Sequence, residues 1–154
     1  MTSKTSAFRR FLAALASFLL ACIFGYAAAA KTINPWPAEA FVHSLAPELS
    51  AFWIVRGAAM LEFALAVTLL SGFAPRVTCL LALTTLVVFT IALWRSTDPG
   101  AWRDCGCFGS VTVRGPAQAI ARNGLVIALA SAAYLLQSKA PNLVNVRKPK
   151  EISE

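Results

Sequence analysis

Two cysteines separated by one glycine are the residues of this chain best suited to chemistry. Cys105, Gly106 and Cys107 lie in a polar stretch between two long apolar segments. Residues two apart reach the disulfide range of about 4.4–6.8 Å between Cα atoms only where the chain turns tightly, and Gly106 permits such a turn because it lacks a Cβ. A disulfide closed over so short a ring is strained, and strained, exposed disulfides exchange readily with other thiols.

The spacing of the cysteines leaves three interpretations open. The pair cycles between dithiol and disulfide and exchanges with a partner protein, it chelates a soft ion such as Cu(I), or it forms a stable structural disulfide. A zinc site is not expected, because no second Cys/His pair lies nearby to complete four ligands. We favour the redox interpretation, which makes the chain a candidate thiol-disulfide oxidoreductase. Trp102 and Phe108 flank the pair and are expected to anchor this loop at the membrane interface or to dock the partner.

The rest of the chain is apolar enough to specify a membrane protein. Of its 154 residues, 58% are apolar and 14% are charged, which excludes both an ordinary soluble domain and a disordered chain. Apolar runs of this length can cross the membrane only as helices, because backbone groups in lipid must be satisfied within the segment. We therefore predict one all-α, polytopic domain over residues 1–154, with four transmembrane helices in a bundle at about residues 11–30, 52–73, 77–94 and 117–136.

The net charge of +7 is explained by topology rather than by nucleic acid, which is not expected as a partner. Most basic residues stand at the ends of the apolar runs, where they orient the helices and meet anionic lipid. Placing the N-terminus inside puts eight Lys and Arg on the inner side against four on the outer side. We therefore expect a bacterial-type inner membrane protein with both termini cytoplasmic and the cysteine loop on the periplasmic side.

The segments outside the four runs carry weaker signals. The first run resembles a signal peptide, but it is longer than the usual signal core of about 7–15 residues, so we favour a retained helix. In the first outer loop, Pro37 followed by residues 38–45 predicts a short helix on the membrane surface. Trp36, Phe41, Phe52 and Trp53 are expected to anchor it. Residues 140–154 have no apolar periodicity and are expected to form a mobile cytoplasmic tail.

Charged residues inside the apolar runs must face protein partners, because an unpaired charge in lipid costs about 2.5–3.5 kcal/mol on insertion scales. Glu62 lies about ten residues into the second run and Arg122 about six into the fourth. The depth difference of about 6 Å is within the reach of an arginine, so we predict a Glu62–Arg122 contact that clamps these helices together. Cys22 and Cys79 lie within apolar runs and are expected to act as small apolar residues.

Small residues recur at helical spacing in two of the runs. Ala13, Ser17, Ala21, Gly25 and Ala29 form such a stripe in the first run, and Gly124, Ala128 and Ala132 form one in the fourth. Stripes of this kind let another helix approach closely.

The stretch 104–109 (Asp-Cys-Gly-Cys-Phe-Gly), followed by Arg122 and Asn123, resembles the methylamine utilisation protein MauE family within the wider DoxX-like group. Lys31, Glu62 and Arg76 also stand where that family tends to have such residues. The resemblance implies an inner-membrane accessory protein for maturation or disulfide formation of an exported, disulfide-containing partner. In the family this partner is the small subunit of methylamine dehydrogenase.

Two further functions follow from the same residues and the same resemblance. One is a non-enzymatic Cu(I)-binding or assembly factor that uses the cysteine pair. The other is a DoxX-like subunit of a quinone-linked oxidoreductase. Quinone is the only cofactor that the resemblance suggests, no residue identifies a site for it, and no cofactor is predicted from the sequence itself.

Overall fold

The computed structural model describes residues 2–95 and 116–138, and this part of the chain is helical throughout apart from short turns. Its elements are α1 (Thr2–Ile33), α2 (Trp36–Leu45), α3 (Ala51–Ser71), α4 (Pro75–Arg95) and α5 (Pro116–Ser138). Four of them, all except α2, are long and apolar enough to cross a membrane. The prediction of an all-α polytopic domain with a short helix between the first two spans is therefore confirmed.

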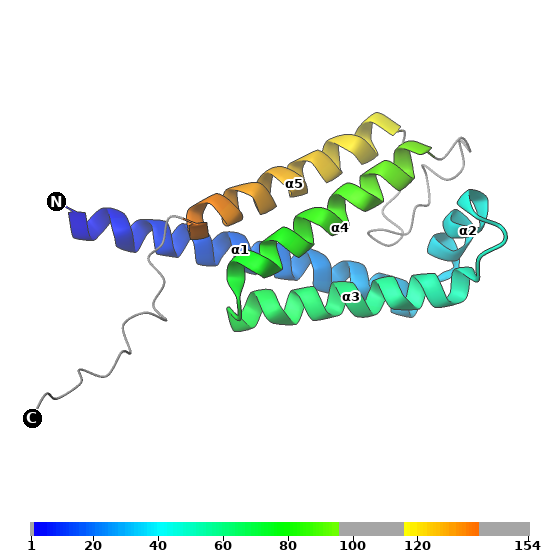
Figure 1. Cartoon of the computed structure of the whole chain (residues 1–154), viewed down its shortest axis with the longest axis horizontal. Coiled ribbons are helices and arrows are strands. Elements are labelled where there is room, and N and C mark those ends of the chain that lie inside the picture. Colours follow the sequence, from blue (N-terminus) through cyan, green and yellow to red (C-terminus); the bar gives the residue numbers. More distant parts are fainter. Residues whose placement is uncertain (1, 96–115, 139–154) are drawn as a thin grey trace, which may run out of the picture.

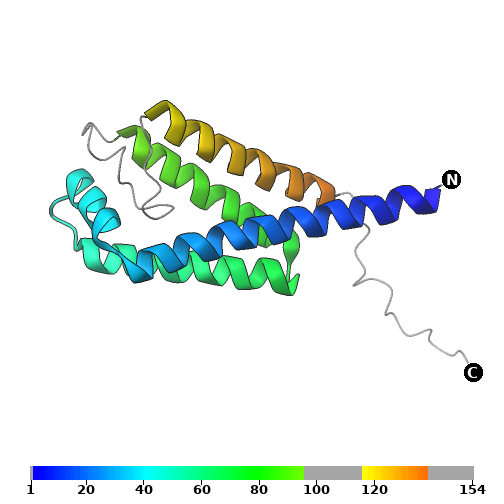
Figure 2. The ribbon, with the colours of Figure 1, turned by 180° about the vertical axis from the view of Figure 1, so that it is seen from behind.

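The four long helices run up and down in an elongated bundle (Figure 1). α1 packs against both α3 and α5, α4 packs against α5, and the shorter contact between α3 and α4 lies beside the turn that joins them. The start of α1 and the end of α5 lie at one end of the bundle, and α2 lies at the other, against α3 (Figures 1 and 2). The end of α4 and the start of α5 lie at the same end as α2. We call this the α2 end of the bundle.

Glycine and proline set the boundaries of the helices. Gly72 terminates α3 with a φ of 65°, a left-handed conformation that glycine adopts without steric cost. Pro75 then begins α4, and Pro116 begins α5, in keeping with the preference of proline for the first helical turn. α2 begins at Trp36, directly after Pro35, and carries Pro37 in its first turn. These residues explain why the apolar runs end close to where the sequence predicts.

α1 is longer than its predicted span of 11–30, since it begins at Thr2 and continues to Ile33. Its last turn therefore includes Lys31, which the apolar run alone placed just outside the helix. The aromatic residues expected to anchor α2 divide into two groups. Trp36, Phe52 and Trp53 are exposed, as an anchoring role requires, but Phe41 is buried and belongs to the protein interior.

The core is made mainly of small side chains, which brings the helices close together. Leu20, Cys79, Ala82, Ala130 and Ala133 have no exposed surface at all. The stripe of α1 lies partly in this core, where Gly25 faces Ala66 of α3. The stripe of α5 does not: Gly124, Ala128 and Ala132 are exposed, and the buried face of that helix instead carries Asn123, Val126, Ala130 and Ala133. Small residues therefore occupy two faces of α5, one buried and one exposed.

Ala130 and Ala132 offer a matched test of this assignment. Ala130→Leu adds three carbon atoms to a closed core, and overpacking of this kind costs about 1–3 kcal/mol. We expect it to lower the melting temperature of the purified protein, whereas Ala132→Leu, on the exposed face of the same helix, leaves it nearly unchanged. Equal melting temperatures for the two variants would contradict the helix rotation described here.

Candidate functional site

The residues that the sequence marked for chemistry are only partly described by the structure. Cys105, Gly106, Cys107, Trp102 and Phe108 lie outside the described residues, as does the tail over 140–154. The geometry therefore concerns the polar and charged side chains of the helices, which include Glu62 and Arg122.

Glu62 lies in the middle of α3 and is almost completely buried, with 3% of its surface exposed. Both of its carboxylate oxygens accept hydrogen bonds from the ammonium group of Lys31, at 2.7 and 2.9 Å. Lys31 comes from the last turn of α1 and is itself only 5% exposed. The two helices are thus joined by a buried, hydrogen-bonded ion pair inside an apolar bundle.

The partner of Glu62 in this ion pair is Lys31, whereas the sequence predicted a contact with Arg122. Depth along a helix does not fix how the helix is rotated about its axis. The sequence also gave no reason to count Lys31 as an intramembrane charge, because it follows the apolar run. Because α1 continues through Lys31, the long side chain of Lys31 lies at the interface between α1 and α3, where its ammonium group binds Glu62.

A third helix contributes to the same site through an aromatic ring. The ammonium nitrogen of Lys31 lies 5.7 Å from the centre of the Phe89 ring in α4. At this distance the negative face of the ring attracts the cation, and the attraction gains strength where water is excluded. Lys31 is therefore held by a carboxylate from one neighbouring helix and by an aromatic ring from another.

Asn123 brings the fourth long helix, α5, to the edge of this site. It is 3% exposed, and its amide nitrogen donates to the hydroxyl of Thr90 in α4 at 3.4 Å. A small cavity of about 10 Å³ is lined by both Glu62 and Asn123, together with apolar side chains from α1 and α4. A volume of this size accommodates a single water molecule, and the side-chain oxygen of Asn123 has no partner within the part of the chain that the structure describes. Neither Asn123 nor Thr90 was expected in this role.

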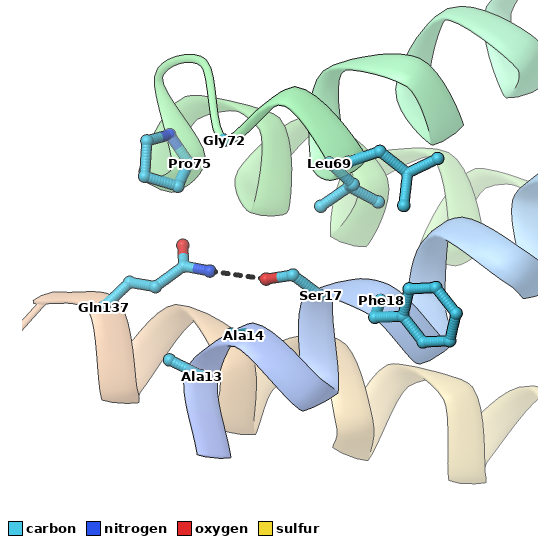
Figure 3. Close-up of a pocket in the computed structure, with 9 residues that line it drawn as sticks. Ala13, Ala14, Ser17, Phe18, Leu69, Gly72, Pro75 and Gln137 are labelled. Carbon is cyan, nitrogen blue, oxygen red and sulfur yellow. Dashed lines mark hydrogen bonds between the residues drawn. The ribbon is translucent and has the colours of Figure 1, made fainter. Parts of the chain in front are cut away.

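A second polar cluster lies at the opposite end of the bundle. Gln137 of α5 donates from its amide nitrogen to the hydroxyl of Ser17 in α1 at 2.8 Å, beside a pocket of about 450 Å³ between α1, α3, α4 and α5 (Figure 3). The thiol of Cys79 lies 3.5 Å from the amide oxygen of the same glutamine. Arg76 donates to the backbone carbonyl of Gln137 at 3.3 Å. These contacts join α1, α4 and α5 at this end of the bundle.

The two cysteines in the helices have different surroundings. Cys79 is buried in the core, and Cys22 is exposed on the surface of α1. Neither forms a disulfide with another described residue. Within residues 2–95 and 116–138, no group of three His, Cys, Asp or Glu side chains is arranged to bind a metal ion.

The cluster of Lys31, Glu62, Phe89 and Asn123 is therefore the candidate functional site among the described residues. It is buried, charged and built from all four long helices. It lies toward the α2 end of the bundle, because Lys31 stands two residues before the end of α1. The segment 96–115, which carries the cysteine pair, is attached at that same end, to Arg95 and Pro116.

The ion pair can be tested by removing one partner and then both. Lys31→Met leaves the Glu62 carboxylate buried without its cation, and breaking a buried pair in this way costs about 3–5 kcal/mol. We expect a large fall in thermal stability. The double variant Lys31→Met with Glu62→Leu is expected to recover most of the loss, because no unpaired charge remains. Arg95→Met, at an exposed position, is the control and should leave stability unchanged; a double variant no more stable than Lys31→Met would contradict the pairing.

Comparison with known proteins identifies a matching family. The family model described as "Methylamine utilisation protein MauE" matches residues 9–136, which include all of α3 and α4, most of α1 and α5, and the segment that carries the cysteine pair. No curated protein and no solved structure matches the chain.

Proposed function

Because the chain belongs to the methylamine utilisation protein MauE family, we propose that it is a membrane accessory protein that assists disulfide formation or maturation of an exported partner. The observation that carries the proposal is the Cys105-Gly106-Cys107 stretch, in a segment that joins two adjacent transmembrane helices. In the family's namesake pathway the partner is the disulfide-containing small subunit of methylamine dehydrogenase, and we propose a partner of the same chemical type here.

The proposed chemistry is thiol-disulfide exchange. A thiolate of the partner attacks one sulfur of the Cys105–Cys107 disulfide and forms a mixed disulfide, while the other sulfur leaves as a thiolate. A second thiolate of the partner then attacks the mixed disulfide. The partner gains a disulfide, and the pair takes up two electrons and, at neutral pH, protons to become a dithiol. A two-electron acceptor must then reoxidise the pair, and a membrane quinone is the class of acceptor that we propose.

The membrane topology supports this role. An even number of spans places the start of α1 and the end of α5 at the same end of the bundle, and the α2 end at the other. The excess of Lys and Arg in the segments on the side of the N-terminus favours a cytoplasmic location for that side. We therefore propose that the cysteine segment is on the periplasmic side of a bacterial-type inner membrane, where disulfides persist.

In this proposal the buried site has a supporting role. Glu62 and Lys31 fix the packing of α1 against α3, and Asn123 with Thr90 fixes α4 against α5, the two helices from which segment 96–115 departs. In this arrangement α1 and α3 cannot slide past each other without separating charges in a medium of low dielectric constant, and they support the helices that flank the cysteine pair.

Thiol trapping in intact cells tests the proposed function. A membrane-impermeant maleimide added after mild reduction should label the wild type, and labelling should fall by half in Cys105→Ser and in Cys107→Ser. The Cys22→Ser and Cys79→Ser variants are matched controls that retain the full signal, because their thiols lie within the membrane span. In either single variant the remaining thiolate can attack a disulfide of the partner, whose other sulfur leaves as a thiolate, and the mixed disulfide should accumulate because the cysteine that would release it is absent.

Two results would contradict this proposal. One is a cysteine pair that stays inaccessible from outside the cell in every redox state. The other is stoichiometric binding of Cu(I) by the pair with no exchange against a thiol, which would identify a copper-binding factor instead.

A further inference from the structure

A long groove follows the contact between α1 and α3 on the surface of the bundle. It has a volume of about 740 Å³. Small residues of α1, namely Ala21, Gly25, Ala28 and Ala29, form its floor, and larger apolar side chains of α3, among them Phe63 and Leu70, line its side. Because this surface faces the membrane, either a lipid chain or another helix must fill the groove.

The groove has one polar end. Arg56 lines it there and is exposed, about 7.5 Å along α3 from the first residue of that helix at 1.5 Å per residue. Its guanidinium carbon lies 4.4 Å from the centre of the Phe52 ring, a contact that leaves the hydrogen-bond donors available. Lys31 also lines the groove, but its ammonium group is held by Glu62. The exposed cation of this groove is therefore Arg56.

The length of the groove suits an acyl chain. From Arg56 to Leu70 the groove follows fourteen residues of α3, or about 21 Å. The hydrocarbon core of one leaflet is about 15 Å thick, half of the total of about 30 Å. A phospholipid whose phosphate lies at Arg56 can thus place a whole acyl chain in the groove. The position of Arg56, in the second turn of α3, is also where an arginine in a membrane helix reaches the headgroup region.

Several molecules would fit the shape of the groove, and the positive charge of Arg56 distinguishes between them. A second copy of the chain, packed through the same groove about a twofold axis, would bring two Arg56 side chains toward each other. A neutral isoprenoid would fill the apolar part but give the guanidinium no anion. An anionic phospholipid satisfies both parts, because the guanidinium fork binds phosphate oxygens through two parallel hydrogen bonds.

We propose that the groove between α1 and α3 is a binding site for one anionic phospholipid, with its phosphate on Arg56 and an acyl chain over Gly25 and Ala29. The site is separate from the cysteine pair and does not depend on thiol exchange. It gives the bundle a preference for anionic membranes that its exposed apolar surface alone would not produce.

The probe is the full-length protein reconstituted in lipid nanodiscs that contain phosphatidylglycerol and phosphatidylcholine in equal amounts. After the protein is released from the nanodiscs, native mass spectrometry counts the lipid molecules that stay bound to it. We expect the wild type to retain phosphatidylglycerol about fivefold more than phosphatidylcholine, the factor that corresponds to about 1 kcal/mol for one arginine at a lipid surface. Arg56→Gln should retain lipid without this preference, and Arg56→Lys should keep part of it.

Two further variants separate the charge from the groove. Ala29→Phe fills the floor at an exposed position and should reduce retention of both lipids, while Arg95→Gln removes an exposed cation elsewhere and should change neither. An unchanged lipid preference in Arg56→Gln would overturn the proposal. So would a retained isoprenoid, or a dimer that Ala29→Phe dissociates. Thiol trapping of the cysteine pair is unaffected by either result, so this proposal and the proposed function fail independently.

Discussion

The buried ion pair between Lys31 and Glu62 is the interaction on which the rest of the bundle depends. Two unpaired charges at this depth would oppose insertion of both α1 and α3, whereas the pair satisfies each charge with a bidentate contact. Because its donor stands in the last turn of α1, the first helix is required for burial of Glu62. Removal of α1 as a signal peptide would take away the cation and a large part of the core, including Leu20 and Phe24.

Around this pair the helices are joined by contacts at two levels. Near the α2 end, Asn123 and Thr90 join α5 to α4, and the Phe89 ring connects α4 to Lys31. At the other end, Gln137 joins α5 to Ser17 of α1. Between these levels the core relies on alanine and leucine, which fit closely but give little specificity in lipid. The polar contacts therefore determine which helix faces are buried, and the small side chains allow the helices to approach.

The sequence predicted the helices well and their rotations poorly. Length and apolarity define a membrane span, and glycine or proline marks its ends, so the four spans and α2 followed directly. Rotation about the helix axis is different, because a span in lipid is apolar on every side and has no polar face to orient it. For this reason Glu62 was expected to contact Arg122, whereas its carboxylate accepts hydrogen bonds from Lys31. Phe41 was misplaced for the same reason, since an apolar residue at the interface fits either environment.

The arrangement separates the stable part of the protein from the part proposed to react. α1 and α3 are fixed by an ion pair that cannot open without exposing charge to lipid, and they carry the lipid groove on their outer side. α5 packs against α1, where Gln137 donates a hydrogen bond to Ser17, and α4 packs against α5, where Asn123 donates one to Thr90. Neutral hydrogen bonds between membrane helices contribute about 0.6 kcal/mol on average, far less than a buried ion pair loses when one partner is removed. The helices that flank the cysteine segment are thus the more weakly held pair, which suits a segment that must approach another protein while its foundation stays in place.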